Sequence, residues 1–182
     1  MVGIPGTVGG ALAMNAGCFG SETWEIVGHV DTINRNGEQK RKNCNEFDWG
    51  YRFVEKDYEE WFTGAQFNLT PCDSSQGKDN IRKSLKTRSE TQPIQTANAG
   101  SVFRNPMGDF AARLIETAGL KNFQIGQAGI SGVHANFIEN KGKATAKDIE
   151  NLIGHAVEEV EKVHGVRLEL EVKIIGRTIS DE

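Results

Sequence analysis

The stretch Gly3-Ile4-Pro5-Gly6-Thr7-Val8-Gly9-Gly10 decides how the rest of the chain is interpreted. Glycine has no Cβ atom, so the backbone N–H groups of such a loop can approach a phosphate or an aromatic ring closely. The loop is either a packing turn made of small residues or part of a cofactor site. Glycine spacing alone favours the packing turn, because short glycine patterns also arise by accident.

Length and charge limit the classes of function. The chain has 182 residues and a formal net charge of −4, and 182 residues suffice for one or two domains with a real hydrophobic core. The acidic balance argues against nucleic acid as a partner, since phosphate backbones bind clustered basic residues. The nearest basic cluster, formed by Lys83, Lys86 and Arg88, also contains Ser and Glu and is typical of a solvated helix face. No apolar run approaches the ~18 residues of a membrane span, so we expect a soluble protein with no membrane partner.

The cysteines and histidines indicate the compartment and argue against a metal site. Cys18, Cys44 and Cys72 are odd in number and widely spaced, which suits reduced thiols in the cytoplasm better than a disulfide framework or a zinc site. The four histidines have no Cys or carboxylate partners at metal-ligand spacing. We therefore expect a cytoplasmic protein without a bound metal.

The first half of the chain is predicted to be mainly β-structure. Residues 26–34 and 38–42 form a predicted hairpin, because Asn36-Gly37 between them tolerates the positive φ angles of a tight turn. A further strand is predicted over 61–69. The polar stretch 70–79 has the composition of a loop and is the best candidate for a domain boundary zone.

The second half is predicted to be richer in helices. Asp79 can cap a helix that runs to about Ser89. Asp109 can cap a second one, whose apolar face carries Phe110, Leu114, Ile115 and Ala118 and which Gly119 ends.

Thr145-Ala146-Lys147-Asp148 opens the clearest helix, and Gly165 ends it. Its apolar stripe predicts a core face, and a partner-binding face is the alternative; the stripe comprises Ile149, Leu152, Ile153, Ala156, Val157, Val160 and Val163. Strands are predicted over 133–139 and 167–175. In the second of these, Leu168, Leu170, Val172 and Ile174 share one face.

Three further segments change the interpretation of the glycine loop. They are Gly50-Tyr51-Arg52, Ala99-Gly100-Ser101-Val102-Phe103-Arg104-Asn105-Pro106 and Leu168-Glu169-Leu170-Glu171-Val172-Lys173-Ile174-Ile175-Gly176. Together with Asn15-Ala16-Gly17, Gln124-Ile125-Gly126 and His134-Ala135-Asn136-Phe137-Ile138, they closely resemble the UDP-N-acetylenolpyruvoylglucosamine reductases, the flavoenzymes of peptidoglycan precursor synthesis. Each motif alone is weak, but the ordered set is specific and covers nearly the whole chain.

The resemblance implies an α/β (α+β) fold. Residues 1–90 would be the rear part of an FAD-binding domain of the PCMH/VAO type with a connection, and residues 91–182 an α/β substrate-binding domain. The implied reaction is the NADPH- and FAD-dependent reduction of UDP-N-acetylglucosamine enolpyruvate to UDP-N-acetylmuramate, which serves cell wall biogenesis, cell shape and cell division. Family members carry a first FAD-binding lobe ahead of the glycine loop. We therefore expect the isolated chain to be inactive alone and to need a separate N-terminal FAD-binding fragment.

The resemblance also implies the site residues. It assigns catalysis to Arg52, Ser101 and Glu171, and substrate contacts to Tyr51, Asn105, His134 and Asn136. FAD contacts fall on Gly3, Ile4, Pro5, Gly6, Thr7, Gly9, Gly10 and Asn15. One departure is visible, because family members commonly have a serine two residues after the arginine, where this chain has Phe53-Val54. The short interval from Arg52 to Ser101 resembles the subclass without an inserted tyrosine-bearing substrate loop.

Each catalytic residue has an alternative interpretation when its residue type is considered alone. Arg52 suits a carboxylate because guanidinium stays charged and binds through two N–H groups, but such an arginine is often a surface ion-pair residue. Ser101 can be a proton donor or a loop hydroxyl that bonds nearby backbone. Alternation alone makes Glu171 a solvent-facing carboxylate, and His134 is equally compatible with a buried, hydrogen-bonded role. Two other functions stay open, a non-catalytic nucleotide-sugar-binding module and a different flavin oxidoreductase on the same scaffold.

Overall fold

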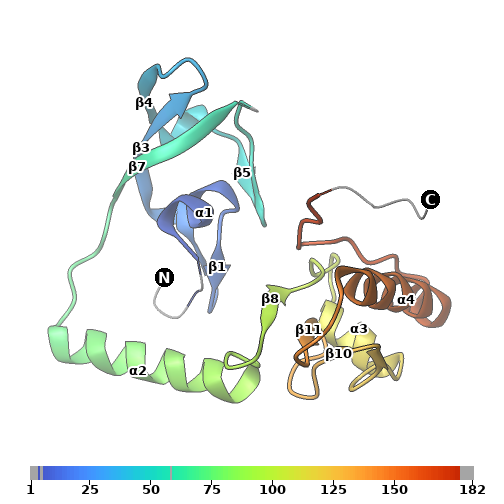
Figure 1. The fold of residues 1–182 in the computed structure, drawn as a ribbon. Coiled ribbons are helices and arrows are strands. Elements are labelled where there is room, and N and C mark those ends of the chain that lie inside the picture. Colours follow the sequence, from blue (N-terminus) through green and yellow to red (C-terminus); the bar gives the residue numbers. More distant parts are fainter. Residues whose placement is uncertain (1–3, 5, 58, 177–182) are drawn as a thin grey trace. The chain divides into compact units, whose positions relative to one another are not determined.

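The computed structural model describes residues 4, 6–57 and 59–176. The chain divides into two compact units, Met1–Arg88 and Ser89–Glu182, and Figure 1 shows the elements of each. The first unit is mainly β-structure with one long helix, and the second combines a four-stranded sheet with two helices.

A three-stranded antiparallel sheet forms the centre of the first unit. Strand β3 (Val27–Asn34) lies between β4 (Gln39–Asn43) and β7 (Glu60–Phe67). The β3–β4 turn contains Gly37 at φ +82°, and the Asn34 side chain accepts hydrogen bonds from the backbone N–H groups of Asn36 and Glu38. The predicted hairpin at Asn36-Gly37 is therefore confirmed.

Short elements surround this sheet. They are α1 (Val8–Ala13), β1 (Gly17–Cys18), β2 (Ser21–Glu22), the 3-10 helices η1 (Thr23–Ile26) and η2 (Cys44–Glu46), β5 (Trp49–Gly50) and β6 (Phe53–Val54). Their apolar residues enclose a small core of Leu12, Trp24, Val27, Val30, Phe47 and Val54. Trp24 lies at its centre, with its ring centroid 4.9 Å from that of Phe47 and its indole N–H donating to the carbonyl of Leu12 at 2.8 Å. This core holds α1 and its neighbouring loops in place.

Helix α2 (Ser74–Thr91) begins earlier than the sequence pattern predicts. Asp73, not Asp79, caps it, because the Asp73 carboxylate accepts the backbone N–H groups of Ser75 at 2.8 Å and Gln76 at 3.2 Å. These bonds satisfy the first turn, so the loop predicted over 70–79 is wrong from Ser74 onward.

The second unit is built on an antiparallel sheet with the strand order β8-β11-β10-β9. These strands are β8 (Asn98–Ser101), β9 (Gln124–Ile125), β10 (Ala128–Ile130) and β11 (Phe137–Asn140). Helices α3 (Ala111–Thr117) and α4 (Ala146–His164) contribute to one apolar core with the sheet. Its fully buried side chains include Phe103, Leu114, Ile115, Ile130, Leu152 and Val160.

Helix α4 follows its predicted boundaries and face. The Thr145 hydroxyl accepts the N–H of Asp148, the Asp148 carboxylate accepts the N–H of Thr145, and Gly165 ends the helix at φ +67°. Leu152, Ile153, Ala156 and Val160 are buried, whereas Val163 at the end of the stripe is 51% exposed. The core interpretation of the stripe is confirmed up to Val160.

Two details at α3 differ from prediction. Phe110 is 65% exposed and precedes the helix, and the first helical N–H, that of Ala111, is accepted by the Asn105 side chain and not by Asp109. The predicted end of the helix is confirmed, since Gly119 has φ +80°.

The two predicted strands of the second unit are shorter than expected. Ala135 and Asn136 form a turn, and β11 begins only at Phe137. Over 167–175 the structure has only an isolated antiparallel bridge, from Leu170 to Phe103. The N–H groups of Glu171 and Val172 both donate to the Val102 carbonyl, at 2.8 and 3.3 Å, which interrupts the regular ladder beside this bridge. Leu168 is buried in the core and Val172 packs against it, whereas Leu170 and Ile174 are 37% and 56% exposed, so the predicted apolar face forms only in part.

Candidate functional site

The glycine loop lies at the surface of the first unit. Gly6 has φ +116°, which L side chains rarely adopt, and Thr7 caps α1 by accepting the N–H of Gly10 at 3.1 Å. Gly6 and Thr7 are exposed. A Cβ atom on Gly9 or Gly10 would meet its nearest neighbours at 3.9 and 3.5 Å, an ordinary contact distance, so packing among the described residues does not require glycine there. Gly3 and Pro5 lie outside the described residues.

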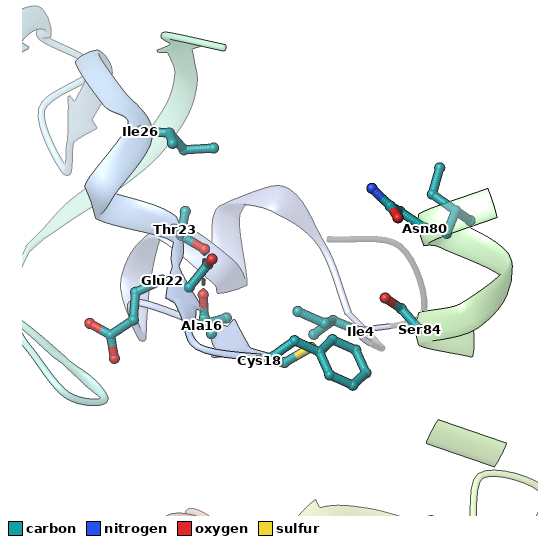
Figure 2. Close-up of a pocket in the computed structure, with 12 residues that line it drawn as sticks. Ile4, Ala16, Cys18, Glu22, Thr23, Ile26, Asn80 and Ser84 are labelled. Atoms are coloured by element: carbon teal, nitrogen blue, oxygen red, sulfur yellow. Dashed lines mark hydrogen bonds between the residues drawn. The ribbon is translucent and has the colours of Figure 1, made fainter. Parts of the chain in front are cut away.

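A cavity of about 270 Å³ adjoins this loop. Apolar side chains of Ile4, Cys18, Phe19, Ile26 and Ile81 line much of it. Its polar margin includes Glu22, Thr23, Asn80 and Ser84, and Figure 2 shows these residues around the opening. The volume is slightly below the ~300–1,000 Å³ typical of pockets for whole small-molecule ligands, so the cavity can accept only part of a dinucleotide.

Arg52 lies in the turn between β5 and β6 and reaches the loop that follows α1. Its guanidinium donates to the carbonyls of Gly17 at 3.0 Å and Asn15 at 3.5 Å and lies 5.0 Å from the Tyr51 ring centroid. Arg52 has φ +56°, an uncommon value for a residue with a side chain. The arginine is therefore held in a defined direction beside the segment that connects α1 to β1, and the Tyr51 side chain is 45% exposed.

Asn15 is completely buried. Its side-chain amide donates to the Glu22 carboxylate at 2.7 Å and the Gly50 carbonyl at 2.9 Å and accepts the N–H of Trp24 at 3.0 Å. Glu22, which sequence reasoning did not select, lines the cavity and accepts this bond from Asn15.

In the second unit, the backbone of the segment Ser101–Arg104 forms hydrogen bonds to the segments that carry most of the predicted site residues. On one side, the N–H of Val102 donates to the Asn136 carbonyl at 2.9 Å. On the other, the Val102 carbonyl accepts the N–H of Glu171 at 2.8 Å, and the N–H of Arg104 donates to the Glu169 carbonyl at 2.8 Å. Ser101, half-buried at the end of β8, is thus adjacent in sequence to the residue that anchors Glu171.

The predicted substrate-binding residues of this unit have local partners. The buried Asn136 side chain accepts the N–H of Phe103 at 3.0 Å and donates to its carbonyl at 2.8 Å, which fixes the segment after Ser101. Asn105 is exposed, and its side chain accepts the N–H of Ala111. Because Ala135 and Asn136 form a turn, His134 and Asn136 lie before β11 and not in the strand predicted over 133–139.

Burial determines the charge of His134. The ring packs against Phe137 with centroids 4.9 Å apart, and Nδ1 accepts the N–H of Asn136 at 3.3 Å. Burial lowers the pKa of His134 below its ordinary value of 6.5, so the ring is neutral at pH 7. The neutral ring can form hydrogen bonds with a substrate, but it carries no charge that could attract one.

Asp109, in the loop that leads to α3, should contribute stability that depends on pH. Its hydrogen bond from Arg113, with a further one from the N–H of Phe110, lowers the pKa of Asp109 from 3.8 to about 2. The lowered pKa means that the contribution is complete above the unfolded value and is lost as pH falls from about 4 to 2. We expect the stability difference between the wild-type protein and Asp109→Asn to shrink over that interval in urea titrations. Glu150→Gln controls for the loss of one negative charge, and a difference that stayed constant down to about pH 2 would contradict the assignment.

The structure therefore brings the predicted residues together in two groups, one in each unit. Arg52, Tyr51 and Asn15 form the first beside the glycine loop, and Ser101, Asn136 and Glu171 surround Val102 in the second. Within residues 4, 6–57 and 59–176, no group of three His, Cys, Asp or Glu residues could hold a metal ion. In that same part of the chain, none of the helices has the length and apolar character to cross a membrane.

Comparison with known proteins connects both groups to one family. Residues 92–175 match the family model described as UDP-N-acetylenolpyruvoylglucosamine reductase, C-terminal domain. The curated UDP-N-acetylenolpyruvoylglucosamine reductase of Thiobacillus denitrificans is 53% identical over 178 residues, which are 97% of this chain and 55% of the relative. That of Methylococcus capsulatus is 52% identical over 176 residues, or 97% of this chain and 58% of the relative.

A solved structure agrees with the sequence comparisons. The crystal structure of the Thermus caldophilus UDP-N-acetylenolpyruvylglucosamine reductase matches with a TM-score of 0.82 at 31% identity, over 94% of this chain and 61% of that one. The predicted mixed α and β fold is thereby confirmed. The chain spans somewhat more than half the length of the curated relatives it matches. These matches, which include both groups of site residues, show that the chain belongs to the UDP-N-acetylenolpyruvoylglucosamine reductase family.

Proposed function

We propose that this chain supplies the substrate-reducing site of a UDP-N-acetylenolpyruvoylglucosamine reductase. The reaction converts the enolpyruvyl group of UDP-N-acetylglucosamine enolpyruvate into the lactyl ether of UDP-N-acetylmuramate, with FAD as cofactor and NADPH as reductant. The observation that supports this most is the anchoring of Glu171 on Val102, directly after Ser101. The backbone segments that carry Ser101 and Glu171 therefore lie next to each other, which supports a role for both residues in one site of the second unit.

The chemistry of the substrate defines what the protein must do. An enolpyruvyl ether has an electron-rich double bond, so addition of hydride to its terminal carbon requires that the adjoining carboxylate be polarised and the developing enolate charge be stabilised. The other carbon must then receive a proton. Bound reduced FAD would supply the hydride.

Arg52 would bind the enolpyruvyl carboxylate. Guanidinium keeps its charge, and its planar donors match a carboxylate in geometry. The bonds to the carbonyls of Asn15 and Gly17 fix its direction before substrate arrives, so little reorganisation is needed on binding. Glu171, in the second unit, is the other residue that would polarise the enolpyruvyl carboxylate.

Ser101 would donate the proton to the second carbon. The pairing of β8 with β11 at Phe137 and the bonds from Asn136 to Phe103 hold the backbone on both sides of the serine. A donor held by a rigid strand end can meet the distance requirement of proton transfer, which is about 2.6–3.2 Å between heavy atoms. Asn105 and the neutral His134 would contact the nucleotide-sugar portion.

The residues of the glycine loop fit part of an FAD molecule. The loop is exposed, Gly6 has a conformation suited to glycine, and Gly9 and Gly10 are not required by internal packing. The adjoining apolar cavity can accept a flat ring or a ribose. Ile4, Gly6, Thr7, Gly9 and Gly10 would hold the cofactor, and the Thr7 hydroxyl can donate to a phosphate while it accepts from Gly10.

The size of the cavity leads to a prediction about cofactor retention. Because about 270 Å³ encloses only part of FAD, we expect the chain by itself to purify without stoichiometric flavin. We define the reconstituted protein as this chain mixed with FAD and with the part of the Thiobacillus denitrificans relative that lies outside the matched region. Flavin absorbance after gel filtration should follow the reconstituted protein and not the chain alone.

The outcomes of this experiment separate the candidate functions. Stoichiometric flavin on the chain alone would contradict the interpretation of the cavity. Substrate binding without flavin in the reconstituted protein would favour a nucleotide-sugar-binding module. Flavin reduction by NADPH without turnover of the enolpyruvyl sugar would favour a different flavin oxidoreductase.

A further inference from the structure

Asn15 joins three segments of the first unit through one buried side chain. Both amide hydrogens are used, one for the Glu22 carboxylate at 2.7 Å and one for the Gly50 carbonyl at 2.9 Å. The amide oxygen accepts the N–H of Trp24 at 3.0 Å, and the residue has no exposed surface. Removal of this amide would take away the partner of the buried Trp24 N–H and of the half-buried Glu22 and Gly50 acceptors.

One of these side-chain bonds and one bond to the Asn15 backbone lead to the turn that carries Arg52. The Asn15 side chain holds the carbonyl of Gly50, two residues before Arg52, and the Asn15 carbonyl accepts from the Arg52 guanidinium at 3.5 Å. The hairpin is small, with only the pairs Trp49–Val54 and Gly50–Phe53. Its position in the first unit therefore depends strongly on contacts from outside the hairpin.

Backbone conformation also indicates that the surroundings determine this arrangement. Asn15 has φ +43° and Arg52 has φ +56°, both uncommon for residues with side chains. Such conformations persist where neighbouring contacts impose them, and they are often found at functional sites. The buried Asn15 amide provides contacts of this kind for both residues.

We propose that Asn15 is a positioning residue that sets the direction of the Arg52 guanidinium, instead of contacting the cofactor itself. Its amide fixes the start of the β5–β6 turn, and its carbonyl receives the arginine. The catalytic consequence rests on the proposed function, in which Arg52 binds the enolpyruvyl carboxylate. The structural consequence is that the direction of the Arg52 guanidinium depends on the Asn15 side chain. This consequence does not rest on the proposed function.

The test uses the 182-residue chain labelled with ¹⁵N and the NMR resonance of the Arg52 Nε–H, which Arg52→Lys assigns. Asn15→Asp keeps the shape and the acceptor oxygen, and aspartate tolerates positive φ. It loses both donors and places two carboxylates together at Glu22. Adding Glu22→Gln gives position 22 an amide N–H that can donate to the new carboxylate at position 15. The two single variants and the double variant therefore complete a double-mutant cycle. The Trp24 indole N–H, bonded to Leu12, reports whether the core of this unit remains folded.

The cycle has definite outcomes. We expect Asn15→Asp to shift or broaden the Arg52 resonance while the Trp24 signal persists, and the double variant to recover part of the change. If Asn15→Asp alone does not fold, the double variant tests the proposal, because its side chain at position 15 still cannot donate to the Gly50 carbonyl. Any folded protein that carries Asn15→Asp and shows the Arg52 resonance at its wild-type position overturns the proposal.

A kinetic test separates positioning from cofactor contact. In the reconstituted protein, the double variant should raise the KM for the enolpyruvyl nucleotide sugar about tenfold or more while the Kd for FAD stays within about twofold. Weaker FAD binding with an unchanged KM would instead make Asn15 a cofactor residue and overturn the proposal. If the wild-type reconstituted protein does not reduce the sugar, the proposed function fails, and the NMR cycle still decides the role of Asn15.

Discussion

Replacement of Ser101 by alanine should slow the transfer of reducing equivalents from flavin to the enolpyruvyl sugar about 10²- to 10⁴-fold, the range for loss of a positioned acid. The physical reason is that the hydroxyl supplies the proton that the second carbon needs. The strand end that carries it is fixed by β11 and by Asn136, which holds the hydroxyl in one position. Stopped-flow mixing of the reduced reconstituted protein with substrate measures this half-reaction separately.

Ser131→Ala is the matched control for this prediction. Ser131 is buried in the same unit, and its hydroxyl accepts the N–H of Val133 at 3.2 Å, a local structural role. This variant should change the rate little. A Ser101→Ala rate within about twofold of the wild type would return Ser101 to the role of a loop hydroxyl that bonds nearby backbone.

Replacement of Arg52 by alanine should affect only one of the two half-reactions. A hydrogen bond to a charged group contributes about 1.5–3 kcal/mol, so reoxidation of the flavin by substrate should lose roughly ten- to a hundredfold in kcat/KM. Reduction of the flavin by NADPH should remain nearly unchanged, because Arg52 is assigned to the enolpyruvyl carboxylate. Glu171→Gln should give the same pattern in rapid-mixing experiments.

Arg41→Ala is the control for the loss of a guanidinium. Arg41 lies in the same unit, is exposed and forms an ion pair with Asp31 at 2.8 Å, an interaction of a kind that contributes little. Its replacement should leave both half-reactions unchanged. Equal losses in both half-reactions for Arg52→Ala would indicate a general structural role and would contradict its assignment to the carboxylate.

The parts of the fold that sequence alone predicted depend on local chemistry. The β3–β4 hairpin follows from Asn36-Gly37, and the boundaries of α4 follow from the reciprocal bonds of Thr145 and Asp148 and from Gly165. In each case, a few neighbouring residues contain all the groups that fix the backbone. The family resemblance likewise rests on short contiguous segments.

The incorrect predictions involve choices that local sequence leaves open. Asp73 and Asp79 are both chemically suitable caps for α2, and only the structure shows that Asp73 takes the role. The alternation over 167–175 resembles a strand, but the segment pairs through an isolated bridge because Glu171 and Val172 both bond the Val102 carbonyl.

The most direct test of the proposed function is a single turnover without oxygen. The reconstituted protein is reduced with NADPH and then mixed with UDP-N-acetylglucosamine enolpyruvate, and both flavin absorbance and the product are followed. The proposal predicts that the flavin is reoxidised as UDP-N-acetylmuramate forms, one molecule per flavin. Flavin that stays reduced in the presence of bound substrate would contradict the assignment of Arg52, Ser101 and Glu171 to an enolpyruvyl-reducing site.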